Sequence, residues 1–276
     1  MTQVPSSPAQ PARPGSPAGD AREETALLPA QLEPEAFGGP WAMQLAIRYV
    51  KAELPTHAQA CASAARAVVT LLPDERSRGD GPWAPAVHRW RDGRIRKLVR
   101  RARGVRWERV QDVPGITVVE GAAQVRAFVP LPARPLPPLL DELQVSGTDY
   151  PRRDDAVGEA PAGEAPAGEA PRGERPDAPG QGGQRPVTIA LTPLVDLTTG
   201  KAAAQCGHAA QLAWEALVLA GESEVLRRWH DAGWAVRVID HCTPTQWAAW
   251  ETSPVRVIDA GFTEVDGPTE TARAWW

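Results

Sequence analysis

The sequence predicts an α/β protein of two similar small domains, each a mixed β-sheet flanked by helices, joined by a disordered linker. Two observations support this fold class. A short apolar strand pattern is followed by a long alanine-rich helical pattern, and this order occurs twice. Stretches rich in proline, glycine and alanine separate the two occurrences from each other and from the N-terminus.

The low-complexity stretches set the domain boundaries. Residues 1–38 are rich in proline, alanine, serine and glycine, and we expect a disordered tail there. In residues 151–186 the motif Gly-Glu-Ala-Pro recurs, and its regularly spaced prolines are incompatible with a helix, so we expect a linker. The folded segments are therefore expected at residues 39–150 and 187–276.

Both folded segments are predicted to begin with a strand and a helix. Residues 43–50 alternate apolar and polar side chains, and a helix is expected over residues 57–72, before Pro73. In the second segment the strand is residues 187–191 and the helix is residues 201–220, with Gly221 as its stop. Each segment then continues with a helical stretch, a strand and a strand–turn–strand ending.

The two segments are interpreted as copies of one another. In the helices, Cys61 aligns with Cys206, and neighbouring alanines align at the same offset. Near the segment ends, Gly115 aligns with Gly261 and Thr117 with Thr263 at almost the same offset. The sequence therefore predicts an internal duplication.

Composition narrows the functional classes. Three cysteines are too few for a disulfide scaffold, which favours a reduced, cytoplasmic location. No apolar run approaches the roughly 20 residues of a membrane span, and the N-terminus has no apolar core of a secretory signal. The net charge of −4 combines a basic segment at residues 41–150 with acidic segments elsewhere. This asymmetry favours a polyanionic partner, or docking of the basic part on the acidic part.

The second predicted helix carries a reactive stripe. Lys201, Gln205 and His208 recur at one helical face, and Lys201 lies in the first turn, where free N–H groups attract anions. A lysine there suits a developing oxyanion, and a histidine can exchange protons near neutral pH. Asp259, expected at a strand end, could orient water or accept a proton. Taken singly, each could instead be a solvated lysine, a structural histidine or a turn-forming aspartate.

Two motifs in the second segment resemble those of peptidyl-tRNA hydrolases of the archaeal and eukaryotic type, type 2. Residues 200–210 read Gly-Lys-Ala-Ala-Ala-Gln-Cys-Gly-His-Ala-Ala, similar to the helix signature of that family. Residues 259–264 read Asp-Ala-Gly-Phe-Thr-Glu and are followed by a glycine–proline turn and Thr271, similar to the second signature. The resemblance covers nearly all of residues 187–276.

The resemblance implies hydrolysis of the ester between a peptide, or an N-blocked amino acid, and tRNA. It implies no metal and no organic cofactor. By motif position the catalytic residues would be Lys201, His208, Asp259 and Thr271, with Gln205 and Thr263 in support. Either His208 or Asp259 would be the general base.

The first segment is expected to be catalytically silent. In the alignment Thr56, Ala60, Ser63 and Val113 replace the lysine, glutamine, histidine and aspartate. Because the family commonly forms homodimers, the silent copy would act as a built-in partner in an intramolecular pseudo-dimer. A homo-oligomer is the alternative.

Basic residues dominate positions 89–106, where Ile95, Leu98, Val99 and Ala102 recur at helical spacing. We expect an amphipathic basic helix there whose cationic face docks tRNA phosphates. The candidate tRNA-binding residues are Arg94, Lys97, Arg100, Arg101 and Arg103. The alternative is a solvated helix, or one paired with the acidic second segment.

Two other functions remain compatible with the sequence. One is a non-catalytic tRNA-binding protein that kept the hydrolase fold. It is favoured by the turn before Lys201, which lacks the extra lysines usual in the family. The other is a protein-interaction module, which the acidic charge of the second segment would suit.

Overall fold

The computed structural model describes residues 39–152, 187–260 and 267–276. The predicted tail, nearly all of the predicted linker and residues 261–266 lie outside the described residues. In the N-terminal half the elements are β1 (Trp41–Arg48), α2 (His57–Leu71), η1 (Glu75–Ser77), α3 (Ala84–Arg91), β2 (Arg96–Ala102), α4 (Val105–Arg109), η2 (Val110–Asp112), β3 (Gly115–Glu120), β4 (Ala123–Phe128), β5 (Leu131–Pro132) and α5 (Pro138–Asp141). In the C-terminal half they are β6 (Val187–Leu191), α6 (Thr199–Leu219), α7 (Ser223–Asp231), β7 (Val236–Ile239), α8 (Pro244–Ala249), β8 (Val255–Asp259) and β9 (Thr269–Trp275).

The two halves contain mixed sheets of the same order, which confirms the α/β class. The N-terminal sheet has the order β2-β1-β4-β3, with the short β5 also paired to β1, and the C-terminal sheet has the order β7-β6-β9-β8. In each sheet the first two strands are parallel, and the third is antiparallel to both of its neighbours. Three strands of each sheet therefore point the same way.

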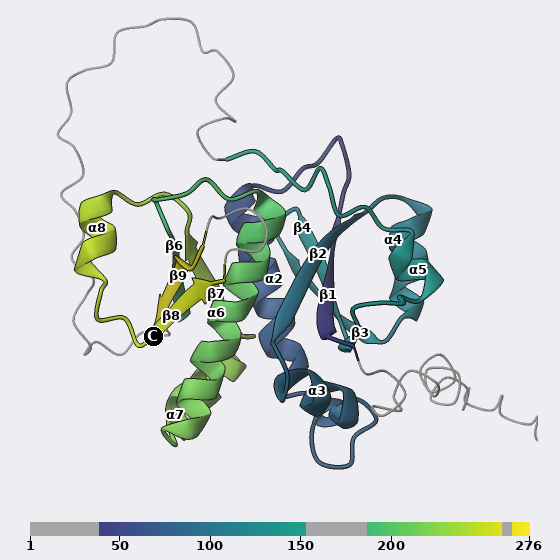
Figure 1. The fold of residues 1–276 in the computed structure, drawn as a ribbon, viewed down its shortest axis with the longest axis horizontal. Helices are drawn as coiled ribbons and strands as arrows, with labels where there is room; N and C mark the ends of the chain where they lie inside the picture. Colours follow the sequence, from purple (N-terminus) through teal and green to yellow (C-terminus); the bar gives the residue numbers. More distant parts are fainter. Residues whose placement is uncertain (1–38, 153–186, 261–266) are drawn as a thin grey trace, which may run out of the picture.

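The helices α2 and α6 form a layer between the two sheets (Figure 1). Strand alternation explains this arrangement, because Met43, Leu45 and Ile47 of β1 and Ile189 of β6 all point into one continuous apolar core. Residues from both halves share this core. The predicted "two small domains" are therefore two halves of one packed body.

Small side chains let the central helices approach each other closely. The core contains Cys61, Ala64, Ala65, Cys206 and Ala209, which are all fully buried. A Cβ atom added at Gly207 would lie 3.1 Å from Cγ2 of Val68. The two helices also start side by side, with Nδ1 of His57 3.0 Å from Oγ1 of Thr199.

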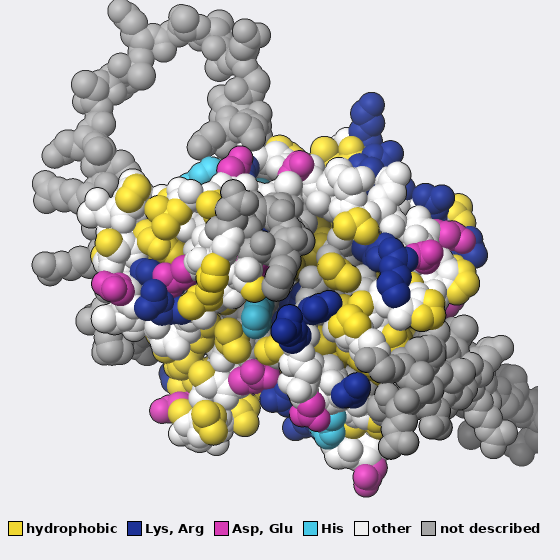
Figure 2. Space-filling view, viewed as in Figure 1, with side chains coloured by type: hydrophobic (Ala, Val, Ile, Leu, Met, Phe, Trp, Pro, Cys, Tyr) yellow, Lys and Arg dark blue, Asp and Glu magenta, His cyan; other side chains and the backbone are white. Residues whose placement is uncertain are grey.

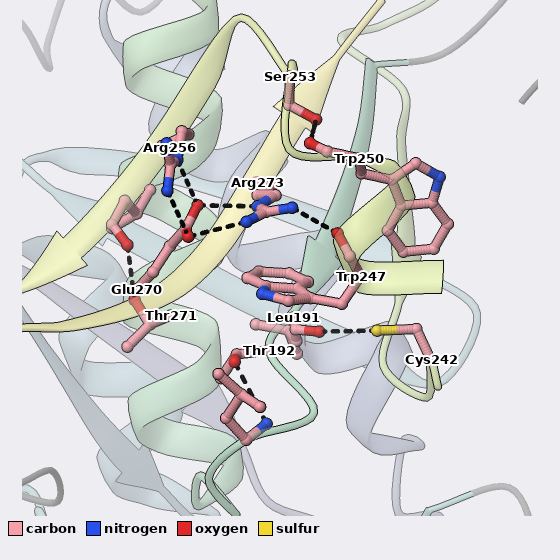
Figure 3. Close-up of polar contacts among 12 residues, drawn as sticks. Leu191, Thr192, Cys242, Trp247, Trp250, Ser253, Arg256, Glu270, Thr271 and Arg273 are labelled. Carbon is pink, nitrogen blue, oxygen red and sulfur yellow. Dashed lines mark hydrogen bonds and ion pairs between the residues drawn. The ribbon is translucent and has the colours of Figure 1, made fainter. Parts of the chain in front are cut away.

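The outer faces of the sheets are covered differently. Behind the N-terminal sheet, α4, η2 and α5 build a second apolar cluster around Trp107, Phe128 and Leu140. Behind the C-terminal sheet lies α8, whose buried Trp247 has the guanidinium of Arg273 4.2 Å from its ring (Figures 1 and 3). The C-terminal sheet therefore has the thinner cover.

Matching local contacts link the two halves beyond their topology. The indole Nε1 of Trp90 donates to the carbonyl of Arg96, and Nε1 of Trp229 donates to the carbonyl of Ala235, both at 2.9 Å. Each tryptophan lies in a helix that ends just before the second strand of its sheet. Each long helix also begins after a threonine N-cap, Thr56 or Thr198.

Most predicted elements are confirmed, and two predictions are wrong. The strand at residues 43–50 and the helix at 57–72 are observed as β1 and α2, and the second pair as β6 and α6. The basic helix is wrong, because Arg96–Ala102 is strand β2. Its apolar residues do not form one stripe: Val99 joins the central core and Ala102 the outer cluster, on opposite faces of the sheet.

The alignment of Gly115 and Thr117 with positions 261 and 263, which lie outside the described residues, also disagrees with the strand positions. Gly115 begins β3, whereas position 261 follows the end of β8. Thr117 faces Arg126 across its strand pair, and Arg256 faces Arg273 across the corresponding pair. The strand register therefore makes Glu120, at the end of β3, the positional counterpart of Asp259, at the end of β8.

Candidate active site

Three strand ends meet at one edge of the C-terminal sheet. Because β6, β7 and β8 are parallel, their carboxyl ends lie on the same side, and α6 begins there as well. In open α/β sheets, ligands usually bind outside the carboxyl ends of parallel strands. The edge also offers the free N–H groups and the positive dipole end of a long helix.

The structure brings Lys201, Gln205 and Asp259 together at this edge. Nζ of Lys201 and Nε2 of Gln205 each donate to Oδ2 of Asp259, both at 2.6 Å. Lys201 lies one turn before Gln205 on α6, and strand alternation turns Asp259 to the α6 side of β8, as it does the buried Val257. The side chains of Lys201 and Asp259 are each 14% exposed, so the ion pair is only slightly open to solvent.

His208 lies further along the same helix and is half-buried. Burial, and then the positive charge of Lys97, lowers the pKa of His208 from 6.5 to about 3, although Asp259 acts in the opposite direction. The imidazole is therefore neutral near pH 7 and has little basicity.

Lys97 is a residue of this region that sequence reasoning assigned to another role. It comes from β2 of the N-terminal half, and its Nζ donates to Oε1 of Gln211 at 2.5 Å. Burial lowers the pKa of Lys97 to about 7, against the influence of Glu215. No spacing in the sequence could reveal this contact, because Lys97 and Gln211 are 114 positions apart.

Thr271 lies within the β8–β9 strand pair. It is fully buried in β9 at an irregularity in the β8–β9 pairing, and its hydroxyl donates to the carbonyl of Val257 at 3.4 Å. Figure 3 shows Thr271 below Glu270 and beside Thr192. In this arrangement Thr271 supports the strand pair. Thr263, the other predicted threonine, lies outside the described residues.

An ion-pair cluster occupies the outer face of the same sheet. The carboxylate of Glu270 accepts two hydrogen bonds each from Arg256 and Arg273 at 2.7–2.9 Å (Figure 3). Hydrogen bonding to Arg273 first, and then to Arg256, lowers the pKa of Glu270 from 4.5 to about 2 despite partial burial. Because Arg273 also donates to the carbonyl of Trp247, the cluster anchors α8 to the sheet.

The helix caps revise the comparison with the N-terminal half. Lys201 is the third helical residue after Thr198, and Gln59 is the third after Thr56. Arg66 then corresponds to His208. Gln59 caps its own helix, and Arg66 forms an ion pair with Glu120 at 3.0 Å. Thr56 and Val113, the counterparts predicted for Lys201 and Asp259, are therefore replaced by Gln59 and Glu120.

The predicted tRNA-binding residues do not share one face. Lys97 points toward α6, where it bonds Gln211. Arg100 is buried on the other side of the strand, where it donates to the side chain of Gln44 and the carbonyl of Leu143. Arg101 and Arg103 lie over the ring of Tyr49, and Arg94 is exposed before β2. In Figure 2 the dark-blue side chains stand in separate groups. The proposed continuous cationic helix face is thus corrected.

A cleft of about 420 Å³ opens at the carboxyl ends of β6 and β7. Its lining is mostly polar, and it includes Thr192, Asp196, Asp240, His241, Cys242 and Arg152. Arg152, which the sequence assigned to the linker, donates to Oδ1 of Asp196 at 2.6 Å and so lies against the C-terminal half. The cleft offers space for a polar ligand at the same sheet edge as Asp259.

Across residues 39–152, 187–260 and 267–276, no group of three or more histidine, cysteine, aspartate or glutamate side chains is placed to hold a metal ion. Among the helices of these same residues, none is both long enough and apolar enough to cross a membrane.

Comparison with known proteins adds no relative: no family model, no curated protein and no solved structure matches this chain. The geometry therefore defines the class of site by itself. It is a lysine–carboxylate–glutamine cluster at a helix N-terminus, beside a neutral histidine, on a mixed α/β sheet.

Proposed function

We propose that the chain is a peptidyl-tRNA hydrolase whose active site lies in the C-terminal half. One observation carries the proposal: the side chains of Lys201 and Gln205 both hold Oδ2 of Asp259, at the edge where three parallel strands end and α6 begins. Three of the residues that the family resemblance selected, Lys201, Gln205 and Asp259, lie together at this point.

The chemistry would be ester hydrolysis by an activated water. Lys201 and the first-turn N–H groups of α6 would stabilise the negative charge that develops on the ester carbonyl oxygen. Asp259, oriented by Gln205, would accept the proton of the attacking water and return it to the ribose oxygen as the ester C–O bond breaks. His208, neutral because of its lowered pKa, would orient that water by hydrogen bonding. The substrate would be tRNA bearing a peptide or an N-blocked amino acid, and the location cytoplasmic.

The N-terminal half is proposed to be a duplicated, silent copy that serves as an intramolecular partner. The shared strand order, the threonine caps and the matching bonds of Trp90 and Trp229 support a common origin. The shared core gives the copy a structural role. Light scattering should then report the mass of one chain, and a stable two-chain particle would contradict the built-in partner.

The test of activity is release of N-acetyl-amino acid from N-acetyl-aminoacyl-tRNA. We expect Lys201→Ala and Asp259→Asn each to lose on the order of 100-fold in kcat, as for other removed electrostatic groups. Glu120→Gln, at the corresponding strand end of the silent half, should stay within about twofold of the wild type. Equal rates for all four proteins, or loss in Glu120→Gln alone, would contradict the assignment.

A second function, tRNA binding without hydrolysis, is favoured by one observation. Lys201 and Asp259 neutralise each other and are only 14% exposed, so the pair could simply hold α6 to β8. A wild-type protein that binds tRNA in a salt-sensitive manner but releases no amino acid would establish this reading.

A further inference from the structure

A second cavity, of about 330 Å³, lies at the opposite end of the molecule from Asp259. It opens where β1 and β2 begin and α3 ends, and its lining includes Trp41, Arg89, Trp90, Arg94 and Arg96. Since α6 has 21 residues, it spans about 30 Å, so the cavity is distant from the proposed active site.

Three arginines around this cavity have no anionic partner within the described chain. Arg89, Arg94 and Arg96 are exposed, and among the described residues none of them forms an ion pair or a side-chain hydrogen bond. Asp92, the acid in the same turn, pairs with none of them. Most other arginines of the structure have partners, as Arg91 has Glu215 and Arg227 has Glu224. Among the described residues, the cavity therefore gathers positive charge that no acidic side chain pairs.

The wall of the cavity also holds an unsatisfied donor. Trp41 is 5% exposed, and its buried indole Nε1 has no hydrogen-bond partner. A buried N–H without an acceptor is unfavourable by about 1–3 kcal/mol, so an acceptor supplied by a ligand would be stabilising. The neighbouring Trp90 differs, because its Nε1 bonds the carbonyl of Arg96.

We propose that this cavity binds a phosphate group of the RNA backbone. Guanidinium forks match phosphate oxygens in geometry and charge, and the N–H of Trp41 can donate to an oxygen in the same group. The proposal rests on the proposed function, since the RNA would be the tRNA substrate, held by its body far from the ester. The described part of the C-terminal half does not repeat these arginines: Ala235 stands where Arg96 does, and Arg228, the counterpart of Arg89, pairs with Glu224 at 3.7 Å.

The test measures binding of fluorescently labelled deacylated tRNA by anisotropy over a range of salt. Arg94→Ala/Arg96→Ala should bind roughly tenfold more weakly at 100 mM salt, and the slope of log affinity against log salt should fall by about 2. Trp41→Phe keeps the ring and removes the N–H, and should weaken binding about fivefold. The control Arg227→Ala/Arg228→Ala removes the same charge elsewhere and should match the wild type. Equal loss in both double variants, or no loss in either, overturns the proposal.

Two further measurements fix the source of the phosphate. In hydrolysis assays, Arg94→Ala/Arg96→Ala should raise KM and leave kcat unchanged, since the cavity is remote from the ester. Adenosine monophosphate, titrated against tryptophan fluorescence, should bind only weakly. Saturation at micromolar concentration that requires Arg94 and Arg96 would identify a free nucleotide as the ligand and overturn the RNA assignment. If tRNA binding depends on these arginines but no ester is cleaved, the phosphate site stands and the hydrolase proposal fails.

Discussion

The two halves use one backbone frame for different side-chain chemistry. In the C-terminal half, Lys201 donates directly to Asp259. Lys201 is the third residue of α6, and Asp259 ends β8, the third strand of that half in chain order. In the N-terminal half the corresponding residues are Gln59 and Glu120. Gln59 turns back to accept from the backbone of Thr56, and Glu120 pairs with Arg66 two turns along the helix.

Equivalent backbone positions in the two halves therefore do not determine the role of the side chains that occupy them. Arg66 also donates to the carbonyl of Gly233, in the other half, so the N-terminal charges connect the halves. The C-terminal charges instead lie at a helix N-terminus beside a polar cleft. A carboxylate at a strand end serves structure in one case, and in the other its lysine partner makes it a candidate for catalysis.

Separating the halves should have the largest effect. Expressed alone, residues 187–276 should show no cooperative thermal transition by circular dichroism, because the face of α6 that carries Cys206 would lose its cover from Cys61 and its neighbours. Coexpressed with residues 39–152, the two pieces should elute together. A cooperative transition of the isolated piece similar to that of the whole chain would show that the halves are independent domains.

Glu270→Gln should have an intermediate effect. It leaves Arg273, which is 5% exposed, without its carboxylate, and we expect a loss of about 2 kcal/mol in unfolding free energy at pH 7. Because the pKa of Glu270 is lowered to about 2, the wild type should lose this stabilisation as pH falls from 4.5 toward 2. The variant should lack that part of the acid dependence. The N-terminal counterpart, Arg126, donates to the carbonyl of Val113. Urea titration at several pH values measures both quantities, and Glu224→Gln is the exposed control.

The smallest expected loss of unfolding free energy is one that should be similar in the two halves. Trp90→Phe and Trp229→Phe each remove one indole N–H that bonds a carbonyl at 2.9 Å. Each variant should lose about 1 kcal/mol in urea unfolding. Similar losses would support the structural equivalence, whereas a loss in only one of them would contradict it.

The fold could be read from the sequence where local periodicity and tertiary burial agree. Residues 187–191 are a short, mostly apolar run, and they form β6 at those bounds. Residues 96–102 could not be read, because Leu98 and Val99 fit a helical stripe as well as a strand. The strand conformation is stabilised over the helical one by the parallel pairing of β2 with β1 and by polar partners of Lys97 and Arg100 that are distant in sequence. Neither partner is visible from spacing.

The candidate site was predictable where its residues share one element. Lys201 and Gln205 lie one helical turn apart, and the spacing indicates their common face. The neighbourhood of His208 was not predictable, because Lys97 comes from the other half. The counterpart of Asp259 was misplaced because the connections between elements differ in length between the halves. Alignment at a nearly constant offset therefore passed over Glu120.

The polar contacts between the halves also restrict which surfaces can associate. In a symmetric pair of identical subunits, every contact occurs twice, with the roles of the two subunits exchanged. Here Arg66 of α2 donates a hydrogen bond to the carbonyl of Gly233, and Gln211 of α6 accepts a hydrogen bond from the ammonium of Lys97. Two N-terminal halves facing each other would have no glutamine for Lys97, and two C-terminal halves would have no lysine for Gln211. The asymmetric bonds thus favour association of unlike halves.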